Sequence, residues 1–324
     1  DVYKRQSIWD KYVPISSVGL YVPGGTAPLV SSFLMQVIPA LTANCPDINV
    51  CTPPSKNGKI HPAILWLANQ LNVTNIYKIG GAQAILSLAN GYLDLPKVDK
   101  IFGPGNSYVA EAKKYVSSKV AIDLYAGPSE VMVVTNSEKN TSIAAIDALS
   151  QLEHGSDSCA FVLSKSKKIL NKVKKEIKVL SEKLSRESLI NSAMDNIILI
   201  KCKSDNDVIN MVNDCAPEHL VLLDEDFPKY INSINNAGSV FCGNMSPVAF
   251  GDYASGSNHV LPTNGSAKYS SGISVNEFYK RISYTNLSKK GIESLGPSVI
   301  TLANYEGLKG HAQSIKKRIK KRSK

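Results

Sequence analysis

The chain has 324 residues, of which 43% are hydrophobic and 20% are charged, and its formal net charge is +10. This length and apolar content are sufficient for one large domain or two ordinary domains with buried cores. No run approaches the roughly 18 consecutive apolar residues of a membrane span, and the chain does not open with the apolar region of a secretory signal, so we expect no membrane partner.

Positive charge is concentrated at the C-terminus. Seven Lys and Arg residues lie within residues 316–324, which leaves a net charge of +3 for the rest of the chain. A terminal run of this kind is usually a solvated helix end, so we expect no nucleic-acid partner. The six cysteines show no C-x-x-C spacing, and scattered thiols predict a reducing, cytoplasmic compartment. Because the given sequence begins at Asp1, the question whether an organellar targeting segment precedes it stays open.

Short apolar runs alternate with helical patterns in the first half of the chain. We expect strands and helices in turn at residues 18–22, 28–43, 48–51, 62–71, 76–79, 82–90, 100–102, 107–117 and 121–124. This alternation predicts a parallel sheet covered by helices on both faces.

The same pattern restarts after residue 130. Strands and helices are expected in turn at residues 131–135, 142–152, 160–163, 168–184, 197–200, 206–213, 220–223, 228–235 and 239–242. The two runs predict an α/β fold with two tandem Rossmann-like parallel-sheet units. Residues 243–272 form a Gly/Ser/Asn-rich stretch of a length that is usually functional or disordered. The remainder indicates a small mainly helical C-terminal region with one strand at residues 299–302.

Glycine-bearing turns follow the predicted strands of the first unit, at residues 21–26, 80–83 and 103–106. Such turns lie at the carboxyl edge of a parallel sheet, where backbone amides and helix N-termini face an anionic ligand. None of them matches G-x-G-x-x-G, so a tight strand-to-helix turn without a ligand is an equally good interpretation. The turns alone therefore leave a nucleotide site open.

Polar motifs of the second unit precede strands, at residues 126–130, 151–155 and 216–219. They therefore lie at the amino edge of the second sheet, which ligands usually avoid in a single α/β sheet. We infer that the carboxyl edge of the first sheet faces the amino edge of the second, with the reaction site in the cleft between them. Gln151 and His154 are one helical turn apart and share a face of their helix end.

Four of the five histidines fall in polar motifs that also carry amide, carboxylate or glycine residues. Any one of them alone would be interpreted as a structural histidine. A cluster of Gln, His and Asp without cysteine suits an exchangeable metal such as zinc or manganese. Glu218 beside His219 supplies two candidate proton acceptors, and Pro217 holds the preceding segment extended.

At this point the motifs closely resemble the histidinol dehydrogenase family, in order, over nearly the whole chain. The resemblance is carried by residues 18–25 (VGLYVPGG), 80–84 (GGAQA), 102–108 (FGPGNSY), 122–130 (IDLYAGPSE), 151–155 (QLEHG), 216–220 (APEHL), 251–262 (GDYASGSNHVLP) and 306–311 (EGLKGH). It implies an enzyme with NAD and Zn²⁺ as cofactors that oxidises L-histidinol through histidinaldehyde to L-histidine, the last steps of histidine biosynthesis.

The resemblance also implies the domain organisation. Residues 1–17 would be a linker remnant, 18–128 an NAD-binding α/β domain, 129–272 a metal- and substrate-binding α/β domain, and 273–324 a small dimerisation domain with a basic tail. Members of the family carry an additional N-terminal segment, so we expect this chain to be truncated and its second unit to be incomplete.

Carried over position by position, the resemblance assigns the site residues. The implied metal ligands are Gln151, His154 and Asp252, with His311 contributed by the partner subunit of a homodimer. Substrate would contact these four residues and His219, together with Ser129, His259 and Glu306, the last of them also from across the interface. Tyr21, Gln83 and Asn106 would bind NAD. His219 would be the general base on the alcohol, and Glu218 would activate the water that attacks the aldehyde.

Three alternatives remain at this stage. A zinc hydrolase, in which Glu218 activates a metal-bound water, leaves the glycine turns of the first unit without a role. A non-catalytic binding protein with a basic tail could retain the same fold. Within the dehydrogenase interpretation, a thiohemiacetal at Cys51 is the rival route to the acid, although no base motif neighbours this residue in sequence.

Overall fold

The computed structural model describes residues 2–3, 6–24, 29–125, 127–184 and 192–319. The chain divides into two compact units. The larger unit comprises residues 15–278, and the smaller one combines residues 1–14 with residues 279–324.

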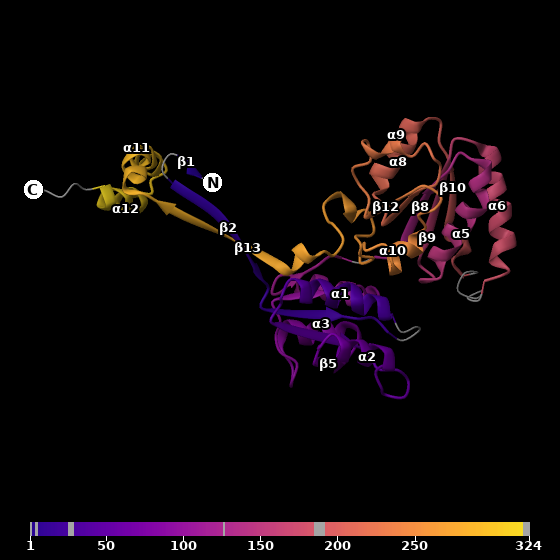
Figure 1. The fold of residues 1–324 in the computed structure, drawn as a ribbon, viewed down its shortest axis with the longest axis horizontal. Helices are drawn as coiled ribbons and strands as arrows, with labels where there is room; N and C mark the ends of the chain where they lie inside the picture. The colour runs from indigo at the N-terminus through magenta and orange to yellow at the C-terminus, as the bar shows by residue number, and fades with distance from the viewer. Residues whose placement is uncertain (1, 4–5, 25–28, 126, 185–191, 320–324) are drawn as a thin grey trace, which may run out of the picture. The chain divides into compact units, whose positions relative to one another are not determined.

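The first half of the larger unit is a five-stranded parallel sheet with the strand order β5-β4-β3-β6-β7 (Figure 1). Its strands are β3 (Ser17–Tyr21), β4 (Asp47–Thr52), β5 (Asn75–Lys78), β6 (Lys100–Phe102) and β7 (Ala121–Ile122). The connecting helices are α1 (Val30–Thr42), α2 (Pro62–Gln70), α3 (Gly81–Asn90) and α4 (Ser107–Val116). With right-handed connections, α1 and α2 cover one face and α3 and α4 the other.

The second half repeats this topology. Its strands are β8 (Glu130–Val134), β9 (Cys159–Ser164), β10 (Ile197–Lys201), β11 (His219–Leu222) and β12 (Ser239–Cys242), in the parallel order β10-β9-β8-β11-β12. Its helices are α5 (Thr141–Leu152), α6 (Lys167–Ser181), α8 (Asp205–Cys215) and α9 (Pro228–Ile231). Numbered within each half, both sheets have the order 3-2-1-4-5. The prediction of an α/β fold with two tandem Rossmann-like units is confirmed.

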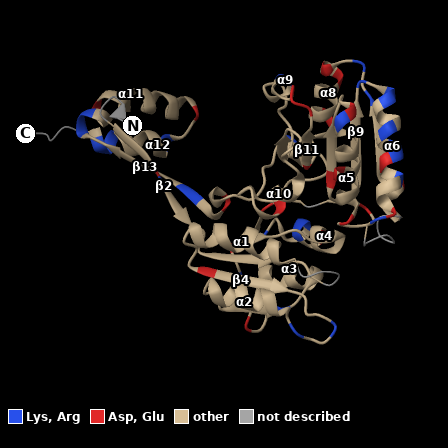
Figure 2. Cartoon of the chain, turned by 45° about the vertical axis from the view of Figure 1, so that its right-hand side comes forward, with Lys and Arg blue, Asp and Glu red and all other residues tan. Residues whose placement is uncertain are grey.

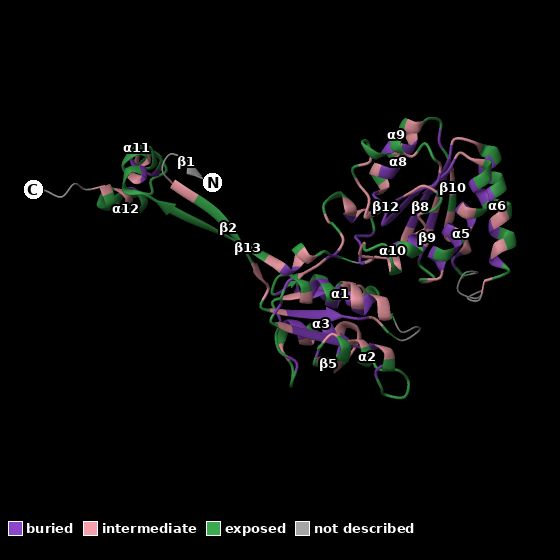
Figure 3. Cartoon of the chain, in the orientation of Figure 1, coloured by how far each residue is buried: buried purple, intermediate pink, exposed green. Residues whose placement is uncertain are grey.

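The central strands of the second sheet are buried on both faces, which explains their nearly continuous apolar sequence. Val131 and Val133 of β8 pack with residues of α5 and α6, while Met132 and Val134 pack with residues of α8 and α9. Figure 3 shows the strands of both sheets as buried segments. The lysines of helix α6 are exposed, as its amphipathic sequence predicts, and Figure 2 shows how many basic residues this helix carries.

The polar stretch that follows the second sheet is not entirely loop. It contains α10 (Val248–Tyr253) and a short 3-10 helix at Ser266–Lys268. Within the described residues, no helix has the length and apolarity that crossing a membrane requires.

The smaller unit is an antiparallel sheet with two helices. Its strands are β1 (Val2–Tyr3), β2 (Gln6–Pro14) and β13 (Tyr279–Leu287), in the order β1-β2-β13. Helices α11 (Lys289–Tyr305) and α12 (Lys309–Ile319) pack against each other. The small, mainly helical C-terminal region is therefore present as predicted.

Two details of this unit differ from the sequence-based expectation. Residues 6–14, expected to be part of a linker remnant, pair with β13 along their whole length. Residues 299–302, expected to be a strand, lie inside α11. Their β-branched side chains favour a strand locally, but helix packing overrides this preference, since a methyl group on Gly296 of α11 would lie 2.2 Å from Ile319 of α12.

Candidate functional site

Glu218 and His219 lie at the amino edge of the second sheet, where β11 begins, and only 5% and 4% of their surface is exposed. The backbone N–H of Glu130 donates to Glu218 Oε2 over 2.8 Å, and the carbonyl oxygen of Glu130 lies 3.2 Å from His219 Nδ1. A carbonyl oxygen only accepts hydrogen bonds, so Nδ1 carries the proton. The neutral ring therefore keeps its lone pair at Nε2, where it can accept a proton.

The neighbours of His219 also determine how firmly the ring holds a second proton. Burial, the largest influence, lowers its pKa, but the hydrogen bond with Glu218 and the charges of Glu218 and Asp252 together raise the pKa above its usual value. Glu218 Oε2 lies 3.5 Å from Nδ1. The adjacent carboxylate thus stabilises the protonated ring that proton transfer would produce.

Gln151 lies in the last turn of α5 and Asp252 lies on α10, whereas His154 follows the C-cap residue of α5, Glu153, and is outside the helix. The pKa of His154 is lowered, chiefly because neighbouring atoms desolvate the ring even though the residue as a whole is exposed. The other influences on this pKa are the charges of side chains from three segments: Asp252, Glu218, His219 and His259. A lowered pKa favours the neutral imidazole that metals require.

The predicted metal ligands Gln151, His154 and Asp252 are of side-chain types that bind divalent metals. The Gln151 side chain is 2% exposed, and its Nε2 has no hydrogen-bond partner in the part of the chain that the structure describes. A buried amide N–H left in this way costs about 1–3 kcal/mol, which a hydrogen-bond acceptor would offset, whereas a metal would bind the other amide atom, Oε1. Among the described residues, no three His, Cys, Asp or Glu side chains are close enough to hold a metal ion. Of the metal ligands predicted in the larger unit, only His154 and Asp252 belong to these four residue types. The predicted metal site therefore requires a further ligand from another subunit.

Residues 252–259 connect the second sheet's amino edge with α1 of the first half. His259 Nδ1 donates to the carbonyl oxygen of Asp252 over 3.1 Å, so its Nε2 accepts from the Ser32 hydroxyl at 3.3 Å. Asn258 Nδ2 donates to the carbonyl oxygen of Met35 over 2.7 Å. Ser32 lies in the first turn of α1, directly after the carboxyl edge of the first sheet.

Sequence reasoning assigned no role to Glu130, which organises the candidate catalytic pair of Glu218 and His219. Its backbone groups hold Glu218 and His219, and its side-chain Oε1 accepts a 3.0 Å hydrogen bond from the backbone N–H of Asn264. Burial raises the pKa of Glu130, and the charge of Glu218 raises it further. Its position directly after Ser129, the predicted substrate contact, was the available signal.

The three predicted NAD contacts all lie at the carboxyl edge of the first sheet. The Tyr21 hydroxyl, at the end of β3, accepts a 3.0 Å hydrogen bond from the backbone N–H of Gly81. Gln83 lies exposed in the first turn of α3. Asn106, also exposed, is the N-cap of α4 and accepts from the Val109 N–H over 3.2 Å. This edge therefore presents amide side chains beside tight backbone turns.

Glu306 and His311 belong to the smaller unit. Glu306 is the C-cap residue of α11 and His311 lies on α12, and both are exposed. The larger unit of one chain contains all the other predicted site residues.

The six cysteines are unpaired, and burial raises the pKa of every one of their thiols. Cys51 has no exposed surface, and its pKa is raised to about 12. A thiol in this state is a poor nucleophile near neutral pH, which argues against the thiohemiacetal route.

The fold and the buried acid–base pair define an α/β enzyme built from two Rossmann-like domains. Distant solved structures share this fold alone, among them a gamma-glutamyl phosphate reductase from Thermotoga maritima, with 15% identity, a TM-score of 0.52, and 87% of this chain and 74% of that chain covered.

The family model for histidinol dehydrogenase matches residues 2–319. The chain is 52% identical to the histidinol dehydrogenase of Pelagibacter ubique, over 96% of this chain and 73% of the relative. It is 45% identical to that of Bacteroides fragilis, over 98% and 75%. The crystal structure of histidinol dehydrogenase from Elizabethkingia anophelis superposes with a TM-score of 0.95 at 42% identity, covering 98% of this chain and 74% of that chain. The chain belongs to the histidinol dehydrogenase family, whose members are oxidoreductases acting on histidinol.

Proposed function

We propose that this chain catalyses the NAD-dependent four-electron oxidation of L-histidinol to L-histidine through histidinaldehyde, at the cleft edge formed by β11, α5 and α10. The observation that carries the proposal is the pair of Glu218 and His219. Both are buried, both are fixed by Glu130, and His219 has its lone pair at Nε2. This arrangement supplies two proton acceptors at one place, as two successive oxidations require.

In the first oxidation, His219 Nε2 takes the hydroxyl proton of histidinol as the carbinol carbon loses its hydride. The carbonyl of Glu130 keeps the ring in the required tautomer, and the carboxylate of Glu218, 3.5 Å from Nδ1, stabilises the positive charge that results. General base catalysis of this kind typically contributes 10²–10⁴-fold to a rate.

In the second oxidation, an aldehyde must be hydrated before it has another hydride to lose. Glu218 takes a proton from the water that attacks the aldehyde, because its Oε2 is held by the Glu130 N–H over 2.8 Å while the second carboxylate oxygen is available. Loss of the second hydride and a proton from the hydrate gives the carboxylic acid of histidine.

Gln151, His154 and Asp252 would hold zinc, with the partner subunit's His311 as the fourth ligand. Zinc bound there would supply a Lewis acid able to anchor the nitrogen ligands of the substrate. The lowered pKa of His154, which favours the neutral imidazole, supports this assignment.

Tyr21, Gln83 and Asn106 would bind NAD, which accepts the hydride in each step. Hydrogen bonds of His259 and Asn258 to α1 support a cleft between this edge and the metal ligands. Ser129 and His259 would line the substrate pocket, and Glu306 would enter it from the partner of a homodimer. The six unpaired cysteines support a reducing compartment, for which we propose the cytoplasm.

Absorbance at the NADH wavelength tests the proposal directly. Two NADH per histidinol should form when the purified chain receives zinc, NAD and L-histidinol, and histidine should accumulate. A chain that hydrolyses amide or ester substrates but yields no NADH would instead support the zinc hydrolase.

A further inference from the structure

A single buried ion pair holds both peptide groups of Gly103, in the turn between β6 and α4. The Gly103 N–H donates to Asp123 Oδ2 over 2.7 Å, and its carbonyl oxygen accepts from Lys113 Nζ over 3.0 Å. Lys113 Nζ and Asp123 Oδ1 form the ion pair, which closes the ring of contacts. We call this ion pair of Lys113 and Asp123 around Gly103 the clasp. Each of the two side chains is 1% exposed.

The turn held in this way lies within the first sheet's carboxyl edge. Gly103 has a φ of +119°, and a Cβ there would lie 2.1 Å from the carbonyl oxygen of Tyr21 and 2.7 Å from Gln36 Oε1. Three residues later, Asn106 caps α4. The glycine is thus pressed against one predicted NAD contact and leads directly to another.

Stability does not account for a lysine buried at this point. Removing an ammonium group and a carboxylate from water costs several kcal/mol for each ion, and apolar replacements of a buried pair are often neutral or stabilising. Lys113 is also too deeply buried to touch a phosphate itself, and its charge is matched by Asp123. What the pair does provide is a fixed direction for the peptide groups on either side of Gly103.

We propose that Lys113 and Asp123 are positioning residues that set the 103–106 turn in the geometry that receives the dinucleotide. This inference rests on the proposed NAD site. The pair acts through the backbone of the turn and does not contact the cofactor. Loosening it would therefore weaken the binding of NAD and leave the machinery at Glu218 and His219 intact.

Asp123→Asn and Lys113→Met test this role, because both keep the size of the side chain and remove its charge. In the full chain with zinc, we expect the KM for NAD and the dissociation constant for NADH, from its fluorescence, to rise about tenfold or more. The kcat and the KM for histidinol should change by less than about twofold.

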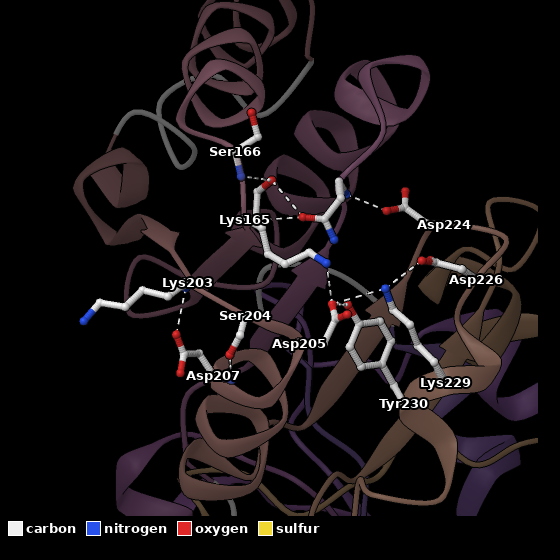
Figure 4. A network of polar contacts seen from close by, with 12 residues as sticks. Lys165, Ser166, Lys203, Ser204, Asp205, Asp207, Asp224, Asp226, Lys229 and Tyr230 are labelled. Atoms are coloured by element: carbon white, nitrogen blue, oxygen red, sulfur yellow. Dashed lines mark hydrogen bonds and ion pairs between the residues drawn. The ribbon is translucent and has the colours of Figure 1, made fainter.

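Asp224→Asn is the matched control, because Asp224 also accepts a hydrogen bond from the backbone N–H of a strand-to-helix turn, that of Asn136, at the carboxyl edge of the second sheet (Figure 4). It should lower Tm without changing the KM for NAD. Clasp variants that lower Tm like Asp224→Asn while the KM for NAD stays within twofold would overturn the proposal.

Hydrogen exchange in the unaltered chain gives an independent measurement that needs no variant. We expect the Gly103 amide to be protected before NAD is added, because the clasp preforms the turn. Rapid exchange of this amide in the absence of NAD would contradict the proposal. A parental chain that forms no NADH with histidinol would refute the proposed function itself, whereas a protected Gly103 amide would still support the clasp.

Discussion

The two sheets of the larger unit have the same strand order, yet their candidate site residues lie at opposite edges. In the first sheet, Tyr21, Gln83 and Asn106 lie at the carboxyl edge, where ligands of α/β folds usually bind. In the second, Glu218 and His219 lie at the amino edge. Shared topology therefore does not decide which edge is used.

The carboxyl edge of the second sheet explains the difference, because its side chains are engaged with one another (Figure 4). Asp205 pairs with Lys165 at 2.7 Å and Lys229 at 3.1 Å, and it accepts a 2.7 Å hydrogen bond from Tyr230. Asp224 accepts a hydrogen bond from the backbone N–H of Asn136, in the turn after β8. Where the turns carry carboxylates and lysines, they satisfy the backbone internally. At the first sheet's carboxyl edge, the exposed side chains of the predicted site are instead the neutral amides of Gln83 and Asn106.

The largest effect is expected from His219→Asn at the amino edge. Loss of the general base should lower the rate of the alcohol step by about 10²–10⁴-fold. Single-turnover NADH formation from histidinol measures it, with Asp224→Asn as the control at the opposite edge. Because the raised pKa keeps His219 protonated to higher pH, the acidic limb of kcat/KM should lie above pH 6.5, the group's usual value. An alcohol step at the parental rate would show that another group takes the proton.

Gly103→Ala should distort the glycine turn at the carboxyl edge of the first sheet. A Cβ at this φ of +119° lies 2.1 Å from the Tyr21 carbonyl oxygen, so we expect a loss of about 3 kcal/mol or more in the free energy of unfolding. Gly58→Ala is the control, because Gly58 also has a positive φ, +74°, but no atom lies within 4 Å. It should cost about 1 kcal/mol. Equal losses in thermal denaturation would mean that backbone strain alone fixes the turn.

Asp147→Asn should be stabilising, in contrast to Asp224→Asn. Asp147 is buried on α5, its Oδ2 has no partner among the described residues, and burial raises its pKa from 3.8 to about 6. The folded chain holds this proton more tightly than the unfolded chain, so the stability it contributes is complete below pH 4 and is lost as the pH rises through about 6. At pH 7 the variant should be more stable by about 2–3 kcal/mol, with no difference near pH 4. Denaturant titrations at both pH values measure this, and a gain that persists at pH 4 would exclude the charge as its cause.

The smallest effect is expected from Lys165→Met in the second sheet's network. The side chains of Lys165 and Asp205 are 33% and 38% exposed, so solvent screens their attraction. We expect a loss of about 1 kcal/mol or less that shrinks further at high salt, with the KM for NAD unchanged. A rise in that KM would mean that the two carboxyl edges are coupled.

Local sequence patterns predicted most of the fold. The ten strands of the larger unit were expected within one or two residues of their ends, because apolar runs between glycine and polar turns report burial directly. The pairing of β2 with β13 could not be predicted in this way. The two strands lie more than 260 residues apart, and each exposes much of its surface, so neither shows an apolar run.

Candidate site residues such as Glu218, His219 and Gln151 could be proposed from the sequence because they lie in short motifs. Glu130, Lys113 and Asp123 act by holding the backbone of other segments, and this role depends on contacts that sequence spacing does not reveal. The residues proposed to touch ligands were therefore assigned from motifs, whereas the contacts of Glu130, Lys113 and Asp123 with the backbone appeared only in the structure.

The entry and exit of the larger unit lie together, since Ile15 N–H donates to the carbonyl oxygen of Phe278 over 2.9 Å. Residues 15–278 thus form an insertion whose two ends nearly meet. Such an arrangement lets a domain be excised, or its ends be joined and new ends opened in a surface loop, with little loss of folding. Residues 15–278 can accordingly be regarded as one domain inserted between the paired strands β2 and β13.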